Sequence, residues 1–253
     1  MCVCFSCRLL AFWSFLQTSM TEPGFVPKDF CDQVAQAREA AAEAGDRVWR
    51  PGEASTCGKC RQSRPERAHH CSICGRCVLR MDHHCPWVGN CIGFANHKYF
   101  IQMTMYGMLA CATFVLTAMP EFWLVFVGKK HRKGRSAFRA QLPIKDQMLF
   151  SLAGMLALSF SVALGVLFCS HIFLLVKNLT SIEMAYRGGN PYDLGKRRNA
   201  SQLLGEMDAS WLLPIAPARP LSDGLSFPSA RQAQGRSHVD VAPIGRRDVD
   251  DGV

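Results

Sequence analysis

Two long hydrophobic segments separate the polar regions of this 253-residue chain. Residues 101–127 are apolar except at Pro120 and Glu121, and residues 147–176 contain no Asp, Glu, Lys or Arg. A helix needs about 20 mostly apolar residues to cross a bilayer. We therefore expect transmembrane spans at 101–127 and 147–176. The alternative, buried helices of a soluble protein, is disfavoured by these lengths.

The first 24 residues contain a shorter apolar segment. Residues 9–16 cover only about half a membrane span, and no convincing signal-peptide cleavage site follows them. We therefore interpret 1–24 as a partial amino-terminal hydrophobic segment. Three cysteines in it are either acylation sites or without function, which the sequence leaves open: Cys2, Cys4 and Cys7. Residues 25–56 are polar and alanine-rich, and we expect a cytosolic lead-in with a short helix over 29–50.

Cysteine and histidine are concentrated in residues 57–91. Seven of the 13 cysteines and four of the eight histidines lie there, and three cysteine pairs have the two-residue separation of a zinc knuckle. With Cys85 set aside, six cysteines and two histidines are enough for two closed Cys3His sites. The region has too few apolar residues for a core of its own. We therefore expect metal to stabilise a domain of short hairpins and loops at 57–100.

The spacing of these residues is a family signature. From Cys57 to Phe100 the chain contains Cys-x2-Cys-x3-Arg-Pro-x-Arg-x2-His-Cys-x2-Cys-x2-Cys-x4-Asp-His-His-Cys-Pro-Trp-x2-Asn-Cys-x-Gly, and it resembles the cysteine-rich domain of the DHHC protein S-acyltransferases. The segments 180–183 and 190–195, with Asn199, resemble the motifs that follow the last span in that family. The resemblance covers roughly residues 21–205. Because members usually carry two spans before the zinc domain, it implies that this chain is truncated at its amino terminus.

The resemblance implies an α-helical integral membrane protein with a small, loop-rich zinc-binding cytosolic domain of short β-hairpins. Its expected activity is transfer of a fatty acyl group, palmitoyl above all, from acyl-CoA to cysteine thiols of membrane-associated proteins. It also implies two structural zinc ions. By the resemblance, one zinc is held by Cys57, Cys60, His70 and Cys77, and the other by Cys71, Cys74, His84 and Cys91.

Cys85 has groups that activate a thiol close to it in the sequence. A free cysteine has a pKa near 8.5, so a nucleophilic thiol needs a base or a positive environment. In extended backbone, residues i and i+2 point to the same side, so His83 can take the proton of Cys85 while Asp82 orients the imidazole. The residues alone do not decide between His83 and His84; the resemblance gives His84 to zinc and the acyl group to Cys85. We expect His69 and His97 to be solvated or hydrogen-bonded.

The net charge of +9 fits an anionic membrane face or an anionic acyl-CoA. A nucleic-acid-binding module is disfavoured, because basic and aromatic residues do not interleave along a recognition helix. We expect Trp87 near the mouth of an acyl-chain cavity among the membrane helices. The candidate partners of CoA form a cluster of five arginines: Arg61, Arg64, Arg67, Arg76 and Arg80.

Close cysteine pairs interleaved with histidine favour metal over disulfides and therefore a reducing compartment. We expect the catalytic domain to face the cytosol from the Golgi, the ER or the plasma membrane. The loop 128–146 is strongly basic, and the positive-inside rule would place it in the cytosol as well. A pair of spans, however, places this loop on the side of the membrane opposite the zinc domain. We give the metal chemistry and the resemblance more weight and expect the loop outside the cytosol. Residues 177–207 are then cytosolic motifs, and 208–253 a disordered tail with Trp211 near the membrane interface.

Two other functions use the same residues. A RING-type ubiquitin-ligase domain needs a final close cysteine pair, but five residues separate Cys85 and Cys91. A truncated, inactive form that serves as a zinc-stabilised membrane scaffold retains every motif. Labelling of the purified protein with a fatty-acid probe distinguishes that scaffold from an enzyme.

Overall fold

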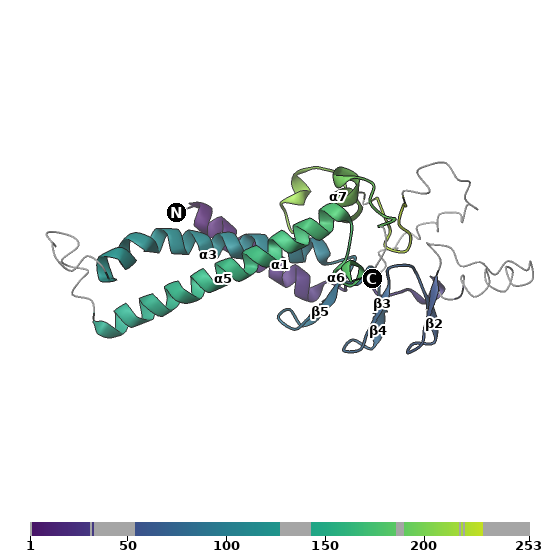
Figure 1. The fold of residues 1–253 in the computed structure, drawn as a ribbon, viewed down its shortest axis with the longest axis horizontal. Coiled ribbons are helices and arrows are strands. Elements are labelled where there is room, and N and C mark those ends of the chain that lie inside the picture. The colour runs from purple at the N-terminus through teal and green to yellow at the C-terminus, as the bar shows by residue number, and fades with distance from the viewer. Residues whose placement is uncertain are drawn as a thin grey trace, which may run out of the picture.

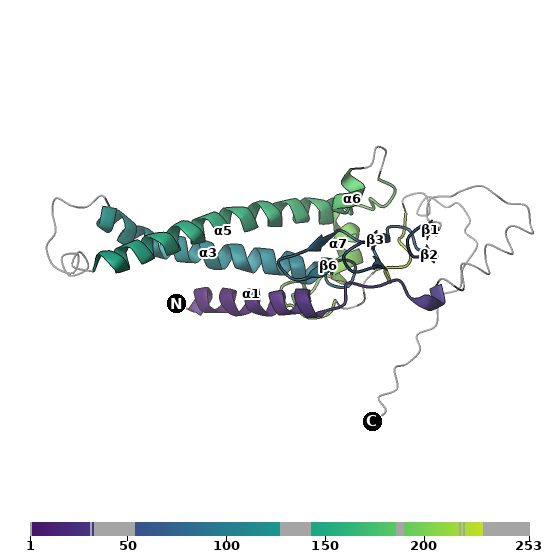
Figure 2. The ribbon, with the colours of Figure 1, turned by 90° about the horizontal axis from the view of Figure 1, so that it is seen from below.

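The computed structural model describes residues 2–30, 32, 54–126, 143–185, 190–217, 219 and 221–229. Three long helices lie side by side and end at a cluster of small hairpins (Figures 1 and 2). These helices are α1 (Cys2–Met20), α3 (His97–Phe126) and α5 (Ile144–Lys177). Three short helices follow α5: α6 (Ser181–Met184), α7 (Lys196–Leu204) and the 3-10 turn η1 (Ala209–Trp211).

The hairpins are three separate pairs of antiparallel strands, each strand only three residues long. They are β1 (Ser55–Cys57) with β2 (Gln62–Arg64), β3 (His69–Cys71) with β4 (Arg76–Val78), and β5 (His83–Cys85) with β6 (Asn90–Ile92). Strands this short do not form a stable sheet by themselves. The fold class expected for this part of the chain, short hairpins with little helix, is confirmed.

Two helices are long and apolar enough to cross a membrane: His97–Pro120 within α3, and α5. Only 6 % of the apolar window of α5 is buried, whereas the core helix of a soluble protein is mostly buried. α3 begins four residues before the apolar segment and α5 three before, because helical hydrogen bonding continues into polar residues. Residues 28–30 and 32 are helical, at the start of the helix expected over 29–50. The rest of that segment, most of the loop 128–146 and the end of the tail lie outside the described residues.

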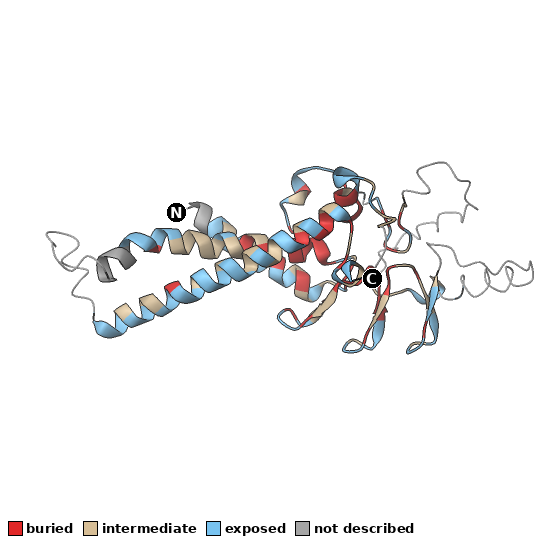
Figure 3. Ribbon diagram, in the orientation of Figure 1, coloured by how far each residue is buried: buried red, intermediate tan, exposed pale blue. Residues whose placement is uncertain are grey.

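Buried residues gather where the long helices meet the hairpins, whereas the far half of α5 is largely exposed and residues 111–120 of α3 are mostly of intermediate exposure or exposed (Figure 3). α3 and α5 approach closely at two glycines. A Cβ at Gly107 would lie 3.0 Å from Leu164, and one at Gly165 would lie 3.3 Å from Met108. α1, predicted as a short partial segment, is a 19-residue helix packed along α3. Near the carboxyl end of α1, the carbonyl oxygens of Thr18 and Ser19 accept hydrogen bonds from Nδ2 of Asn90.

Candidate active site and metal centres

The three hairpins are copies of one unit that repeats every 14 residues. Cys57, Cys71 and Cys85 each end the first strand of a hairpin and stand opposite Gln62, Arg76 and Asn90. The residue four positions after each cysteine has a positive φ: Arg61, Gly75 and Gly89. Each turn therefore directs backbone N–H groups at the sulfur of the cysteine before it. The repeat is visible in the sequence as cysteines at positions 57, 71 and 85, a regular spacing that was not used in predicting the site.

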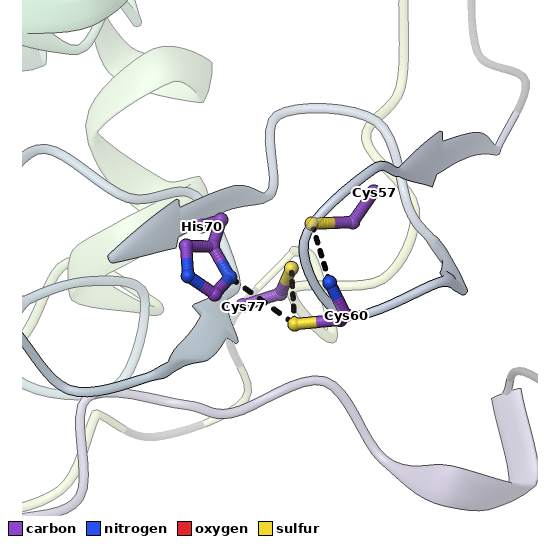
Figure 4. A group of neighbouring side chains, drawn as sticks. All are labelled: Cys57, Cys60, His70 and Cys77. Carbon is purple, nitrogen blue, oxygen red and sulfur yellow. Dashed lines mark hydrogen bonds between the residues drawn. The ribbon is translucent and has the colours of Figure 1, made fainter. Parts of the chain in front are cut away.

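The turn of the first hairpin meets the strands of the second hairpin at four donor side chains (Figure 4). The backbone N–H of Cys60 donates to Cys57 Sγ at 3.4 Å. Cys60 Sγ lies 3.1 Å from His70 Nδ1 and 3.8 Å from Cys77 Sγ. These four residues are the set predicted for the first metal site.

The second turn meets the third hairpin in the same way. Nδ1 of His84 lies 3.5–3.7 Å from the sulfur atoms of Cys71, Cys74 and Cys91. In tetrahedral zinc with bonds of about 2.3 Å to sulfur and 2.0–2.1 Å to nitrogen, neighbouring ligand atoms are about 3.5–3.8 Å apart. The donor type and number of both groups fit Zn²⁺, and the distances in the second group match this spacing. Four protein ligands leave no open position for a substrate.

The third turn has no fourth hairpin to meet among the described residues, and Val88 stands where the first two turns have their second cysteine. Cys85 therefore lies in the same kind of turn as the metal-binding cysteines, but the described residues offer no further ligands that would complete a metal site with it. Backbone N–H groups of Val88 and Trp87 lie near its sulfur and favour its charged form. Burial alone would raise the pKa of this thiol, but His83 and these N–H groups lower it below its usual value. The site therefore favours a thiolate.

Asp82 and His83 form a hydrogen-bonded pair at the start of the third hairpin, two residues before Cys85. Nδ1 of His83 lies 2.7 Å from Oδ2 of Asp82. Burial would lower the pKa of His83, but its hydrogen bonds to Asp82 and Cys85 raise it to about 9. Burial would raise the pKa of Asp82, but the hydrogen bond from His83 holds it well below its usual range. The structure places His83 against Asp82 and His84 among cysteines, a distinction that the residues alone left open.

Ser181 of α6 holds the other side of Asp82. Its backbone N–H donates to Oδ1 and its hydroxyl to Oδ2 of the carboxylate, both at 2.8 Å. α6 is fixed by a capping box in which Thr180 Oγ1 accepts from the N–H of Glu183 and a Glu183 carboxylate oxygen accepts from the N–H of Thr180. Sequence analysis identified this segment only as a motif, because contacts about 100 residues apart in the chain leave no local signal.

Arg67 ties the zinc-type hairpins to α6. It donates to both carboxylate oxygens of Glu183, at 2.7 and 2.8 Å, and to the side chain and backbone of Asn178. Its guanidinium packs against the rings of both Tyr192 and Phe227, at 4.4 and 4.6 Å from the two ring centroids. The prediction that Arg67 is available to CoA is therefore wrong.

Arg80 is also buried, with 2 % of its surface exposed, which removes a second arginine from the predicted CoA cluster. It donates to Nδ1 of His97 at 3.1 Å. Since an arginine can only donate, neutral His97 carries its proton on Nε2, which lies 3.1 Å from Nδ1 of His171 in α5. His97 is thus hydrogen-bonded, in agreement with one of the two environments expected for it.

Asp82, His97 and His171 bring one carboxylate oxygen and two ring nitrogens within 4.8 Å of one another. A metal on Nε2 of His97 would have to replace the proton of a ring that already accepts a hydrogen bond from a buried cation. This trio is therefore better explained as a hydrogen-bonded cluster than as a third metal site. Sequence analysis did not predict it, because His171 lies inside an apolar segment.

A cavity of about 350 Å³ lies beside this cluster, between α5 and α6. His83 and His171 line one side, Ser181 and Met184 another, and apolar residues of α5 such as Leu167 complete it. Leu167 also packs against the buried cluster that contains Cys85. Trp87, at the tip of the third hairpin, is 87 % exposed.

Comparison with known proteins agrees with this geometry. The family model described as DHHC palmitoyltransferase matches residues 50–187, which include all three hairpins, both long apolar helices and α6. The chain belongs to the DHHC palmitoyltransferase family. The resemblance stated from the sequence is confirmed.

Individual relatives extend the match beyond the family model. The probable protein S-acyltransferase 12 of Arabidopsis thaliana is 34 % identical over 87 % of this chain and 76 % of its own length. Palmitoyltransferase ZDHHC20-B of Danio rerio is 33 % identical over 86 % of this chain and 71 % of its own. Palmitoyltransferase ZDHHC15 of Homo sapiens is 37 % identical over a shorter match, which covers 54 % of this chain and 39 % of its own length.

Proposed function

We propose that this protein is a protein-cysteine S-palmitoyltransferase that works through an acyl group carried on Cys85. The observation that supports this most is the third knuckle. Its geometry favours a thiolate, it has no metal-ligand set, and it lies next to a His83–Asp82 pair. Family membership and the names of the relatives point to the same activity.

The first half of the reaction transfers the acyl group to the protein. The sulfur of Cys85 attacks the thioester carbonyl carbon of acyl-CoA, and the bond from that carbon to the CoA sulfur breaks. His83 holds the proton of Cys85 and delivers it to the departing CoA thiolate. Asp82 keeps the ring in the orientation that directs Nε2 toward the sulfur.

The second half passes the acyl group on. A cysteine thiol of a membrane-associated protein gives its proton to His83 and attacks the carbonyl carbon of acyl-Cys85. The bond to Cys85 breaks and its thiolate is restored, so protons and electrons balance over the cycle. In this proposal the two zinc ions are structural, and their ligands His84 and Cys91 hold the backbone on either side of Cys85.

The acyl donor has an apolar part and an anionic part. The chain enters from the bilayer toward the His83 cavity, with exposed Trp87 at the interface. For the anionic CoA part we retain Arg61, Arg64 and Arg76, since Arg67 and Arg80 are engaged internally. Arg76 lies over the ring of Phe25, 3.8 Å from its centroid, and Arg64 donates to Oγ of Ser55 at 3.0 Å.

We further propose that α3 and α5 cross an endomembrane or the plasma membrane with the hairpins in the cytosol. The support is their apolar length and the reduced thiols that zinc requires. A glycosylation acceptor inserted at residues 128–142 tests the orientation. Glycosylation there is expected, and an unmodified, protease-accessible loop would reverse the topology.

Labelling with a clickable palmitoyl-CoA tests the function. The full chain should acquire a hydroxylamine-sensitive label that Cys85→Ser abolishes. Cys169→Ser, at an exposed thiol of α5, is the matched control and should label normally. If the wild-type protein binds two zinc ions but carries no label, it is a scaffold and the enzyme proposal fails.

A further inference from the structure

A second cavity lies on the side of α7. It is an apolar groove of about 460 Å³ formed by α3, α5, α7 and the segment at η1, and we call it the α7 groove. Ile101 and Met105 line it from α3, Ile172 and Leu175 from α5, and Leu204 from α7. It lies at the ends of α3 and α5 that adjoin the hairpins (Figure 1), which is the cytosolic leaflet in the proposed topology.

The α7 groove is distinct from the cavity at His83. The two share no lining residue. Leu167, His171 and Leu174 of α5 face the His83 cavity, whereas Ile172 and Leu175 face the α7 groove. These two sets lie on different sides of one helix, so a molecule in the α7 groove is not the acyl donor in its reactive position.

One end of the α7 groove is cationic. Lys196 and Arg197 line it from the first turn of α7, and both are exposed. The residue before that turn is Gly195, which offers no side chain to cap the helix. The dipole of this nine-residue helix adds to the positive potential, and the carboxylate of Asp193, which accepts from the N–H of Gly195 at 3.0 Å, offsets part of it.

A buried acceptor in the α7 groove lacks a donor. Gln102 is 3 % exposed, and its Nε2 donates to the carbonyl oxygens of Trp211 and Leu213, at 3.0 and 2.8 Å. These two bonds fix the amide so that Oε1 is the remaining acceptor. Oε1 is buried and has no hydrogen-bond partner among the described residues. Leaving such a group unsatisfied is unfavourable, and because Oε1 is covered by protein atoms, a donor from the groove reaches it only when a neighbouring side chain moves aside.

We propose that the α7 groove binds an anionic phospholipid of the cytosolic leaflet. One acyl chain lies along the apolar walls from α3 and α5, and the phosphate lies at Lys196, Arg197 and the amino terminus of α7. The cationic end selects against zwitterionic lipids, because a net negative charge is what the two basic side chains and the helix dipole complement.

The test measures phosphatidylserine that remains bound to the full-length protein. The protein is reconstituted in nanodiscs of equal phosphatidylserine and phosphatidylcholine, re-extracted, and its lipids are counted by mass spectrometry. We expect enrichment of phosphatidylserine, which Arg197→Glu reduces about tenfold or more. Met105→Trp, which fills the groove from a half-buried position, should reduce it as well.

The matched control is Arg198→Glu, which makes the same change of charge one residue later but does not line the groove. It should keep most of the bound phosphatidylserine. Equal losses in Arg197→Glu and Arg198→Glu would mean diffuse surface attraction and overturn the proposal. Equal retention of the two lipids by the wild-type protein, or displacement of phosphatidylserine by palmitoyl-CoA in the Cys85→Ser variant, would also overturn it. These binding readouts do not require acyl transfer, so they stand or fall apart from the proposed function.

Discussion

Replacing Asp82 by asparagine should inactivate the protein without unfolding it. The backbone N–H of Ser181 donates to Oδ1 of Asp82 at 2.8 Å, and a backbone N–H cannot become an acceptor. Oδ1 of the new asparagine therefore stays toward Ser181, and its NH2 group takes the place of Oδ2, 2.7 Å from Nδ1 of His83. The serine hydroxyl can rotate to accept from that NH2 group.

Asp82→Asn changes which ring nitrogen of His83 carries the proton. An NH2 group facing Nδ1 requires that nitrogen to accept, so the ring proton moves to Nε2. The nitrogen facing Cys85 then carries a proton already and cannot take another. Losing a positioned general base costs about 10²–10⁴-fold in rate, and we expect Asp82→Asn to slow acylation of Cys85 within that range.

Single-turnover acylation by palmitoyl-CoA, followed by rapid quenching and intact-protein mass spectrometry, measures this rate. Zinc content and the apparent melting temperature serve as controls and should stay at wild-type values. Alkylation of Cys85 by iodoacetamide should slow in parallel, because it needs the same thiolate. Acylation by Asp82→Asn at the wild-type rate would refute the assignment of His83 as the base and Asp82 as its orienter.

Three further predictions concern the frame around Cys85. Glu183→Gln leaves buried Arg67 without its carboxylate and should lower the free energy of unfolding by about 3–5 kcal/mol. In a double-mutant cycle with Arg67→Met and Glu183→Met, followed by thermal unfolding, the losses of the two single variants should not add. Ser181→Ala removes one hydrogen bond to a charged acceptor, worth about 1.5–3 kcal/mol, and should slow acylation of Cys85 about tenfold or more. Ser181→Thr keeps the hydroxyl and should restore the rate. Acylation by Ser181→Ala at the wild-type rate would show that the contact from α6 does not contribute to catalysis. Cys74→Ser should lose one of two zinc ions by elemental analysis, while Cys169→Ser keeps both.

The sequence predicted most reliably the parts whose contacts are encoded by spacing. With Cys85 set aside, spacing and counting supplied six cysteines and two histidines for two closed Cys3His sites. The division of the ligands between the two sites came from the family resemblance, and the structure brings the same two sets together. The proximity of Asp82, His83 and Cys85 is local, since all lie within four residues, and strand alternation was sufficient to predict it.

The sequence did not predict the contacts that join the hairpins to the rest of the chain. Arg67 resembled a surface charge, yet it pairs with Glu183 more than 100 residues later. His171 resembled an isolated polar residue in an apolar segment, yet it meets His97. Such pairs depend on how α5 and α6 pack against the hairpins, and neither propensity nor periodicity carries that information.

The central claim is that Cys85 carries the acyl group between donor and acceptor. The most direct measurement isolates acylated protein, removes all acyl-CoA, and adds a peptide with one cysteine in detergent micelles. We predict that the acyl group leaves Cys85 and appears on the peptide thiol in equal amount, with both zinc ions retained. An acyl group that maps to another cysteine, or one on Cys85 that the peptide does not remove, would contradict the account.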